Sequence, residues 1–342
     1  MAPKPTRRLA LIETASLAPK YRQIIENVQR AIERGELSLG DRLPSITEIC
    51  RQYGLSRDTA VKAYDQLESQ GVVEARHGQG FFVATRQVNR RIRVFVMFDL
   101  LSNGFKERVY QGLLDAAGGQ VHFDFYSHNF NEETFCHTLE EQRGRHEYYI
   151  VMPFLQSERV KEALARLDQE KLLLLDIDLD FPGKACAVIR QSHDEGLEQA
   201  LESAAARFLN YERFELVFPE HIDNPQCIKA ACRRFCKRHK LPLRITSQLD
   251  PKTVRKGTAY LVIYDTDLVA LVKELHRRGW KTGQDVGIVS YNDTPLKEIA
   301  EGGITVASID FHELGHLAGT QVRLRKPADI LIPTRLIQRK TL

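Results

Sequence analysis

The sequence predicts an α/β protein with a small N-terminal head of three helices and a β-hairpin, followed by a larger body of two α/β subdomains. Three observations predict this organisation. The first 93 residues contain 16 Lys/Arg and 10 Asp/Glu, a formal charge of +6, whereas the remainder contains 33 and 35, a charge of −2. Apolar residues in the head recur at helical spacing. In the body, short apolar runs alternate with amphipathic segments.

The composition is that of a globular protein. Of the 342 residues, 43% are hydrophobic and 27% are charged. No apolar run approaches the roughly 18 residues of a membrane span, and the N-terminal stretch lacks the apolar core of a signal peptide. We therefore predict a cytoplasmic protein with reduced cysteines. The cluster of Cys227, Cys232 and Cys236 matches no zinc-binding spacing, so we predict helix packing there and no metal.

The head should begin with an amphipathic helix that starts near Pro19 and ends at Gly35. Ser45 can cap the second helix, because Glu48 three residues later completes a capping box, and Gly54 can end it. The third helix should run from Ser56, its N-cap, to Gly71. Two short helices joined by the residues Tyr-Gly-Leu-Ser predict a helix-turn-helix in which the second member is the recognition helix.

Two short apolar runs separated by Ala-Arg-His-Gly-Gln-Gly (75–80) then predict a β-hairpin with a basic tip, which makes the head a winged helix-turn-helix. The head closely resembles the GntR-type DNA-binding domain. The matching stretches are GELSLGDRLPS (35–45), LSRDT (55–59), the pattern KAYxxLxxxG (62–71) and HGQGFFV (77–83).

This resemblance, together with helix geometry, implies that side chains at the start of the recognition helix and at the wing contact DNA, with Arg57 as the candidate for bidentate guanine contact. Val61 stands where many relatives carry an arginine, so Lys62 is included and the operator sequence stays open. The predicted DNA-binding residues are Arg42, Ser45, Ser56, Arg57, Thr59, Lys62, His77 and Gly78.

The body should contain parallel sheets covered by helices on both faces. Eight apolar runs are predicted as strands: IRVFVMF, VHFDFY, YYIVMPF, KLLLLDID, ACAVI, FELVF, AYLVIYD and VGIVSY. Eight such units suit two sheets in tandem better than one. No glycine-rich nucleotide-binding loop and no G-x-S-x-G motif is present, so we predict no enzyme, no catalytic residues and no cofactor.

The end of the chain resembles the LacI/GalR-type effector domain. The stretches QDVGIVSYNDTPLKEI, ITVASIDFHELGHLA and ILIPTRLIQR carry the resemblance. It implies a periplasmic-binding-protein-like (type I) body over residues 93–342, after a head at 15–85 and a linker at 86–92. Passages between the subdomains are expected near 178–190, 291–294 and 322–329. The same head on this kind of body is known in arabinose-type repressors, and the resemblance implies a homodimer on a palindromic DNA operator.

A ligand should lie beyond the carboxyl ends of the strands, between the subdomains. Carboxylates and amides there can bind vicinal hydroxyl groups and aromatic rings can stack on a sugar, so the effector is predicted to be a sugar or sugar derivative. Asn292 stands where sugar-binding relatives often have aspartate, and Ala231 where they often have arginine, which Lys229 could replace. The predicted effector-binding residues are Asp99, Asn103, Phe105, Phe154, Asp176, Asp178, Gln191, His193, Glu220, Lys229, Asp265 and Asn292.

One motif competes with this interpretation. The stretch from His312 to His316 reads H-E-x-x-H, the zinc-binding signature of metalloproteases. No third ligand follows it at a suitable spacing, and Asp310, Leu314, Gly315 and Ala318 fit capping and packing positions of the resembled family. The favoured prediction is a transcriptional regulator, most simply a repressor, controlled by a small molecule. A regulator whose body only dimerises and, remotely, a zinc metalloprotease are the alternatives.

Overall fold

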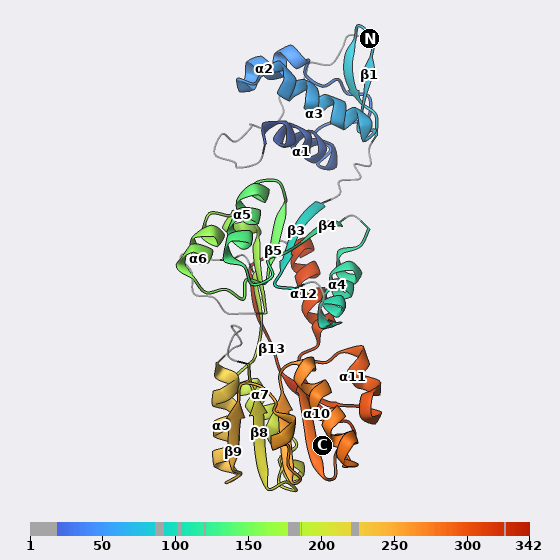
Figure 1. Cartoon of the computed structure of the whole chain (residues 1–342). Helices are drawn as coiled ribbons and strands as arrows, with labels where there is room; N and C mark the ends of the chain where they lie inside the picture. Colours follow the sequence, from blue (N-terminus) through green and yellow to red (C-terminus); the bar gives the residue numbers. More distant parts are fainter. Residues whose placement is uncertain are drawn as a thin grey trace. The chain divides into compact units, whose positions relative to one another are not determined.

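The N-terminal head contains the helices and the hairpin that its capping residues and hydrophobic periodicity predict. The structure is a computed structural model that describes residues 19–85, 92–100, 104–119, 121–176, 185, 187–219, 226–324 and 326–342. The head contains α1 (Lys20–Glu33), α2 (Ile46–Tyr53), α3 (Arg57–Ser69), and the antiparallel strands β1 (Val73–Arg76) and β2 (Gly80–Val83) (Figure 1). These are the three helices and the hairpin predicted from the sequence.

The predicted caps are present in the head. The Ser45 hydroxyl accepts the amide of Glu48, and the Glu48 carboxylate accepts the amide of Ser45, which is the reciprocal capping box. Gly54 ends α2 in the left-handed conformation at φ 62°. Apolar side chains of all three helices and both strands form one core. Tyr64 is fully buried there and donates its hydroxyl to the carbonyl of Pro44 at 2.6 Å, which ties α3 to the start of α2.

Within the described residues, the body contains two six-stranded sheets. The strand order of the first is β13-β7-β6-β5-β3-β4 and that of the second is β14-β12-β11-β10-β8-β9. The first comprises β3 (Ile92–Phe98), β4 (Val121–Ser127), β5 (Tyr148–Val151), β6 (Leu172–Asp176), β7 (Ala187–Gln191) and β13 (Ala328–Ile332). The second comprises β8 (Arg213–Val217), β9 (Leu243–Thr246), β10 (Thr258–Val262), β11 (Val286–Tyr291), β12 (Thr305–Ser308) and β14 (Arg335–Ile337).

Helices cover both faces of each sheet, as expected for parallel strands. Figure 1 shows α5 (Glu132–Gln142) and α6 (Glu158–Ala165) on one side of the first sheet and α4 (Gly104–Ala117) and α12 (Phe311–Leu324) on the other. The second sheet packs against α7 (Glu195–Glu202), α8 (Ala205–Phe208) and α9 (Cys227–Arg238) through one core, and against α10 (Asp265–Arg278) through another. The remaining short helices are α11 (Pro295–Ile299), η1 (Gln169–Lys171), η2 (Pro251–Thr253) and η3 (Ala300–Gly302).

All eight apolar runs predicted as strands form strands, and the α/β fold class is confirmed. The passages between the sheets lie elsewhere than predicted. The chain leaves the first sheet after Gln191, returns after Ser308 and leaves again after Ile332. Each passage is C-terminal to its expected range (178–190, 291–294 and 322–329), because one further strand, β7, β12 or β13, is completed before the crossing. In addition, β14 pairs with β12 in the antiparallel direction.

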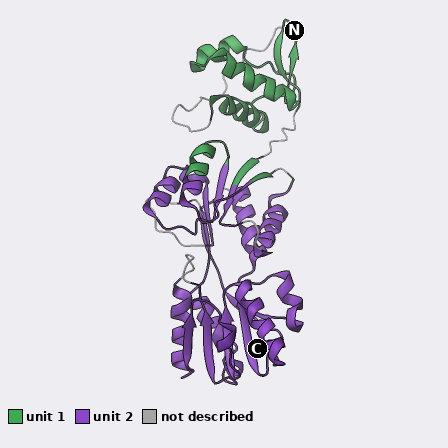
Figure 2. Ribbon diagram, viewed as in Figure 1, with its two compact units in different colours: residues 1–95, 119–124, 137–147 green, residues 96–118, 125–136, 148–342 purple. Residues whose placement is uncertain are grey.

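Two compact units emerge from the contacts within the chain. One comprises residues 1–95, 119–124 and 137–147, and the other residues 96–118, 125–136 and 148–342 (Figure 2). The second unit contains nearly all of both sheets and every contact between the subdomains described below. Within the described part of the chain, no helix combines the length and the apolar composition needed to cross a membrane.

The helices α4 and α12 approach each other unusually closely, because glycines face the contact. A Cβ added at Gly315 would lie 2.0 Å from the carbonyl oxygen of Val109. One added at Gly112 would lie 2.1 Å from the carbonyl oxygen of His312, and one at Gly319 would lie 2.9 Å from the carbonyl oxygen of Leu113. The contact at Gly315 is therefore backbone against backbone, which only glycine permits. The packing role predicted for Gly315 is confirmed.

Candidate functional site

The start of α3 presents a capped helix terminus with an unpaired cation beside it. The Ser56 hydroxyl accepts the amide of Thr59 and lies 2.8 Å from the Thr59 hydroxyl. Arg57, the first residue of α3, is exposed and forms no ion pair within the described residues. Free amides at a helix N-terminus attract phosphate, and an arginine fork matches the edge of a guanine. The geometry therefore suits the DNA contacts predicted for these three residues.

The wing and the turn before α2 lie against each other. Arg42 forms an isolated antiparallel bridge with Phe82, and a Cβ on Gly80 would lie 3.4 Å from the Arg42 guanidinium. His77 and Gly78 are exposed at the hairpin turn, where Gly78 has φ +70°. The Ser45 hydroxyl is committed to the capping box, so its contribution is to fix the start of α2 rather than to offer a free hydroxyl.

Lys62 has a different environment from the rest of the predicted set. Its ammonium lies 4.4 Å from the centre of the Tyr21 ring on α1. Lys62 is five positions after Arg57, which places the two about 140° apart around a helix that advances about 100° per residue. We therefore expect Lys62 to contribute general charge, with base recognition left to Arg57.

A continuous chain of hydrogen bonds joins the two sheets of the body. Gln191 at the end of β7 donates through Nε2 to the Tyr291 hydroxyl at the end of β11 (2.9 Å). The Tyr291 hydroxyl lies 2.9 Å from His193 Nδ1, and His193 Nε2 lies 3.3 Å from the carbonyl oxygen of Asp176. One assignment satisfies every bond: Tyr291 donates to Nδ1, and a neutral imidazole donates through Nε2. Burial lowers the pKa of His193, which is consistent with that neutral form.

Three of the seven non-glycine residues that adopt a left-handed backbone in the described part of the chain lie at or after the ends of β5, β6 and β11. They are Phe154 after β5 (φ 41°), Asp176 at the end of β6 (φ 70°) and Asn292 after β11 (φ 60°). All three were predicted from the sequence as effector-binding residues. Such strain persists only where the surrounding structure imposes it, and it concentrates at ligand sites.

Two of the strained residues also carry unpaired acceptors. The Oδ1 atoms of Asp176 and Asn292 are buried and lack a hydrogen-bond partner. Burial raises the pKa of Asp176 because no cation within the described residues pairs directly with its carboxylate. Buried polar atoms in proteins are usually hydrogen-bonded, so these two oxygens are acceptors that could take a donor from a bound molecule.

Asp99 is already neutralised by a neighbour that sequence reasoning missed. The ammonium of Lys106 on α4 lies 2.5 Å from Asp99 Oδ1, and both side chains are buried. The same ammonium lies 4.9 Å from the centre of the Phe105 ring and 5.4 Å from those of Phe98 and Phe154. Phe105 in turn stacks on Phe311, with ring centres 4.4 Å apart. Phe105 therefore packs against α12 and the Lys106 ammonium, which accounts for its ring without a ligand.

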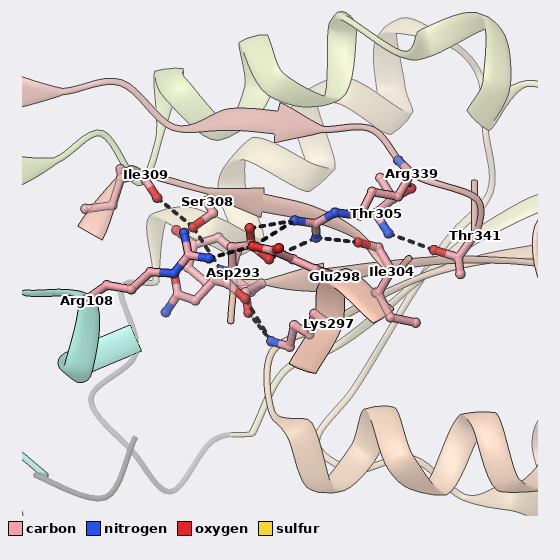
Figure 3. A network of polar contacts seen from close by, with 12 residues as sticks. Arg108, Asp293, Lys297, Glu298, Ile304, Thr305, Ser308, Ile309, Arg339 and Thr341 are labelled. Atoms are coloured by element: carbon pink, nitrogen blue, oxygen red, sulfur yellow. Dashed lines mark hydrogen bonds and ion pairs between the residues drawn. The ribbon is translucent and has the colours of Figure 1, made fainter. Parts of the chain in front are cut away.

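A second network holds the turn after β11 in place (Figure 3). The Arg339 guanidinium binds both carboxylate oxygens of Asp293, at 2.9 and 2.7 Å. Lys297 is buried and donates to the carbonyl oxygens of Tyr291 and Asn292, and its ammonium also lies 2.8 Å from Asp265 Oδ1. Both carboxylate oxygens of Asp293 are thus engaged, whereas Asn292 Oδ1 has no hydrogen-bond partner.

The other predicted effector residues fall into two groups. Lys229 lies with its ammonium 4.4 Å from the centre of the Phe218 ring, after β8. Asn103, Asp178 and Glu220 lie outside the described residues. The structure therefore links Asp176, Gln191 and His193 through Tyr291, the residue before Asn292, and accounts for Asp99 and Asp265 by ion pairs. Lys106 and Lys297 had no sequence signal, since a lysine on an amphipathic helix looks like an ordinary surface residue.

The H-E-x-x-H stretch lies at the start of α12. Asp310 caps the helix, because its Oδ1 accepts the amides of His312 and Glu313. His312 Nε2 lies 2.8 Å from Asp115 Oδ2 on α4. Across the described residues, no three His, Cys, Asp or Glu side chains are grouped in a way that could hold a metal ion. The local geometry is that of a capped packing helix.

Two family models match separate parts of this chain. Residues 20–83 match the family described as bacterial regulatory proteins, gntR family, and residues 185–342 match the periplasmic binding protein-like domain. The mannosyl-D-glycerate transport/metabolism system repressor of Escherichia coli (strain K12) is 38% identical over 81 residues, which are 24% of this chain and 34% of the relative. An HTH-type transcriptional repressor (NagR) of Bacillus subtilis (strain 168) is 33% identical over 95 residues, 27% of this chain and 39% of the relative. This chain thus spans little more than a third of either relative's length.

Solved structures resemble a larger part of the chain. The trehalose repressor from Escherichia coli aligns with a TM-score of 0.61 at 19% identity, over 72% of this chain and 99% of that one. The Lac repressor bound to ONPG aligns with a TM-score of 0.59 at 18% identity, over 84% and 90%. At such identities the likeness concerns the fold, which confirms the α/β body. This chain therefore joins a helix-turn-helix region that matches the gntR family of bacterial regulatory proteins to a region that matches the periplasmic binding protein-like domain, and the fold of the body is similar to that of the trehalose and Lac repressors.

Proposed function

We propose that this protein is a transcriptional repressor that binds an operator through α3 and the wing, and that a small hydroxylated effector bound between the two sheets of its body controls this binding. The observation that carries the DNA-binding half is the capped start of α3 with its exposed, unpaired Arg57. The basic charge of the first 93 residues supplies the sequence-independent attraction to phosphates. In domain terms we propose a head at 15–85, a linker at 86–92 and a body at 93–342, acting in the cytoplasm.

The effector half rests on the unpaired acceptors of Asp176 and Asn292, which need donors such as the hydroxyl groups of a sugar. Similar proteins support that class: one relative is named for mannosyl-D-glycerate and one structural neighbour for trehalose. A further LacI-type neighbour, from Alkaliphilus metalliredigens, is described in complex with D-xylulofuranose (TM-score 0.59, 12% identity, 73% of this chain and 98% of that one). The effector would alter DNA affinity only as far as it prefers one conformation of the body.

The test combines operator selection with a carbohydrate panel. Binding-site selection with the full chain should yield a palindromic sequence, and one panel member should both raise the melting temperature and change operator affinity by about 5- to 150-fold, the usual range of coupling between sites. Asp176→Asn should abolish the response to that sugar while operator binding without sugar stays intact. If the selection enriches no DNA sequence, the proposal that this protein is a transcriptional regulator is wrong. Enrichment without any sugar response would favour a body that only dimerises, an alternative that the internal pairs Lys106–Asp99 and Lys297–Asp265 support.

The proposed working unit is a homodimer, because one winged helix buries too little DNA surface for tight specific binding. Leu296 and Ile299 on α11 are 74% and 75% exposed, and Tyr110 and Leu114 on α4 are also exposed. The Arg108–Glu298 ion pair at 2.6 Å joins these two helices, so exposed apolar side chains occur on two elements that contact each other. Exposed apolar side chains on contacting helices are the kind of residues that a two-fold interface would bury.

Replacing Leu296 and Ile299 together by serine should weaken the dimer by at least about tenfold, because each loses roughly 1.5 kcal/mol or more of apolar burial. Sedimentation velocity at micromolar concentration measures this. Leu209→Ser provides the control, since Leu209 is 50% exposed directly after α8, away from α4 and α11 in the chain. A parent protein that sediments only as a monomer, with and without operator, would exclude the dimer.

A further inference from the structure

A strongly basic segment of the body is not used by either proposed site. Residues 226–256 contain ten Lys/Arg and one Asp/Glu, although residues 94–342 as a whole are close to neutral. The segment covers α9, β9 and η2. Such a local excess in an otherwise balanced domain indicates a surface that meets negative charge.

Part of this charge is neutralised within the fold. Arg234 pairs with Asp194 and Glu198 on the neighbouring helix α7, and Arg238 pairs with Glu198 and Glu202. These pairs hold α9 against α7. Three other cations, Arg233, Lys237 and Lys240, are exposed and form no ion pair within the described residues. Arg233 and Lys237 lie on α9 beside the arginines that pair with the acidic helix, and Lys240 follows the end of α9.

The three free cations surround an open groove of about 480 Å³. The remaining lining residues are Cys236, Leu241, Pro242 and Leu243, so the groove has an apolar floor and cationic walls. A site for small inorganic anions would be expected to offer convergent polar donors rather than an apolar floor. The lining instead suits a chain that carries both apolar and acidic side chains.

The groove opens onto the free edge of a sheet. β9 is the last strand of the second sheet, and Figure 1 shows α9 beside it. Phe214 and Phe218 of the β8 region donate their amides to the carbonyls of Pro242 and Thr246, so the even-numbered residues of β9 face β8. Because successive residues of a strand alternate, the amides and carbonyls of Leu243 and Ile245 face outward, where no strand of the described residues pairs with them.

We propose that the edge of β9 and the groove beside α9 bind an extended acidic segment of a partner protein, which adds to the sheet as one more strand. The outward main-chain groups of Leu243 and Ile245 would supply the ladder. Arg233, Lys237 and Lys240 would select acidic side chains, and the floor at Leu241 and Leu243 would receive the apolar ones. Strand addition of this kind combines main-chain affinity with side-chain specificity.

The charge argues against other occupants. A second copy of this chain would bring the same cations to the same edge, and like charges at a strand edge prevent self-pairing. A nucleic acid could use the cations, but it has no main-chain groups to pair with Leu243 and Ile245. The acidic polypeptide is the occupant that uses all three features of the surface.

The experiment uses the full chain and a fluorescein-labelled ten-residue peptide of alternating Glu and Val, with fluorescence anisotropy as the readout. The triple variant Arg233→Glu, Lys237→Glu, Lys240→Glu should bind at least about tenfold more weakly than the parent, since three exposed charge contacts each contribute up to about a factor of five. The matched control Lys273→Glu, Lys281→Glu, Lys326→Glu makes the same change in net charge on other exposed lysines and should bind within twofold of the parent.

Hydrogen exchange separates strand addition from simple charge attraction. Saturating peptide should slow exchange of the Leu243 and Ile245 amides, and a peptide with alternate N-methylated amides should lose both binding and protection. Equal binding by the N-methylated peptide, equal losses in both triple variants, or no peptide binding would overturn the proposal. Self-association of the parent that the first triple variant abolishes would assign the edge to a second copy instead. None of these readouts involves operator or sugar, so the result is independent of the proposed regulation.

Discussion

Replacing Gly315 by leucine should destabilise the body by about 3 kcal/mol or more, the upper end of what overpacking costs. A Cβ at this position already lies 2.0 Å from the Val109 carbonyl oxygen and 2.8 Å from its carbon, so the backbones of α4 and α12 must separate. Neither neighbour is the flexible end of a side chain that could move aside. Chemical or thermal denaturation of the full chain measures the loss, with the transition of the body followed separately from that of the head.

Two comparisons give this prediction its meaning. Gly119→Ala places a methyl group in open space without a positive φ and should change stability by less than about 0.5 kcal/mol.

The double change His312→Ala, His316→Ala removes the two histidines of the zinc signature and should leave operator binding and effector response nearly intact. Metal analysis of the untreated protein should find no zinc. One zinc per chain, lost in the double variant, would return the helix to the metalloprotease hypothesis.

Removing the side chain of Arg57 should weaken operator binding by about 1–3 kcal/mol and relax sequence preference at one base pair, the expected loss for a bidentate guanine contact. Its guanidinium is exposed and unpaired within the described residues, so truncation to alanine breaks no contact of the free protein. The loss would therefore reflect DNA contact rather than stability. Gel-shift titration against the selected operator and its single-base variants measures both effects.

Lys62→Ala is the matched comparison on the same helix. Its ammonium lies over Tyr21, so we expect a smaller loss of binding affinity that is similar for all DNA sequences. The salt dependence of binding should decrease by the equivalent of about one phosphate contact. Arg57→Ala binding as tightly as the parent would show that α3 is not the recognition helix. If both variants lose the same binding affinity for every DNA sequence, Arg57 contacts phosphate and does not recognise a base.

The head could be predicted almost completely from the sequence because its determinants are local. The capping box of Ser45 and Glu48 spans three residues, and Gly54 ends α2 by its own conformational freedom. The inward residues Ala60, Tyr64 and Leu67 follow from helical periodicity alone. Interactions across one helical turn do not depend on how the rest of the chain folds.

The strands of the body were also predictable, since fully buried parallel strands are continuous apolar runs. Their assignment to one sheet or the other was not. The strand β7 follows β6 in the chain and pairs with both β6 and β13, and 136 residues separate the end of β7 from the start of β13. The hydrophobic pattern of a sequence does not show which strands pair. The passages were therefore expected before β7, β12 and β13 rather than after them.

The sequence by itself determined which polar residues follow the strands, because strand ends and turns depend on residues that are close together in the sequence. Only the tertiary structure decided which of them stay open to a ligand. Asp293 and Asn292 are adjacent, yet Arg339, 46 residues later, binds both oxygens of Asp293 and leaves Asn292 Oδ1 unpaired. Lys106 and Lys297 likewise neutralise Asp99 and Asp265 from neighbouring helices. A carboxylate that already forms an ion pair is less available to bind a ligand. Which lysine or arginine forms that ion pair depends on tertiary contacts between segments that are distant in the sequence.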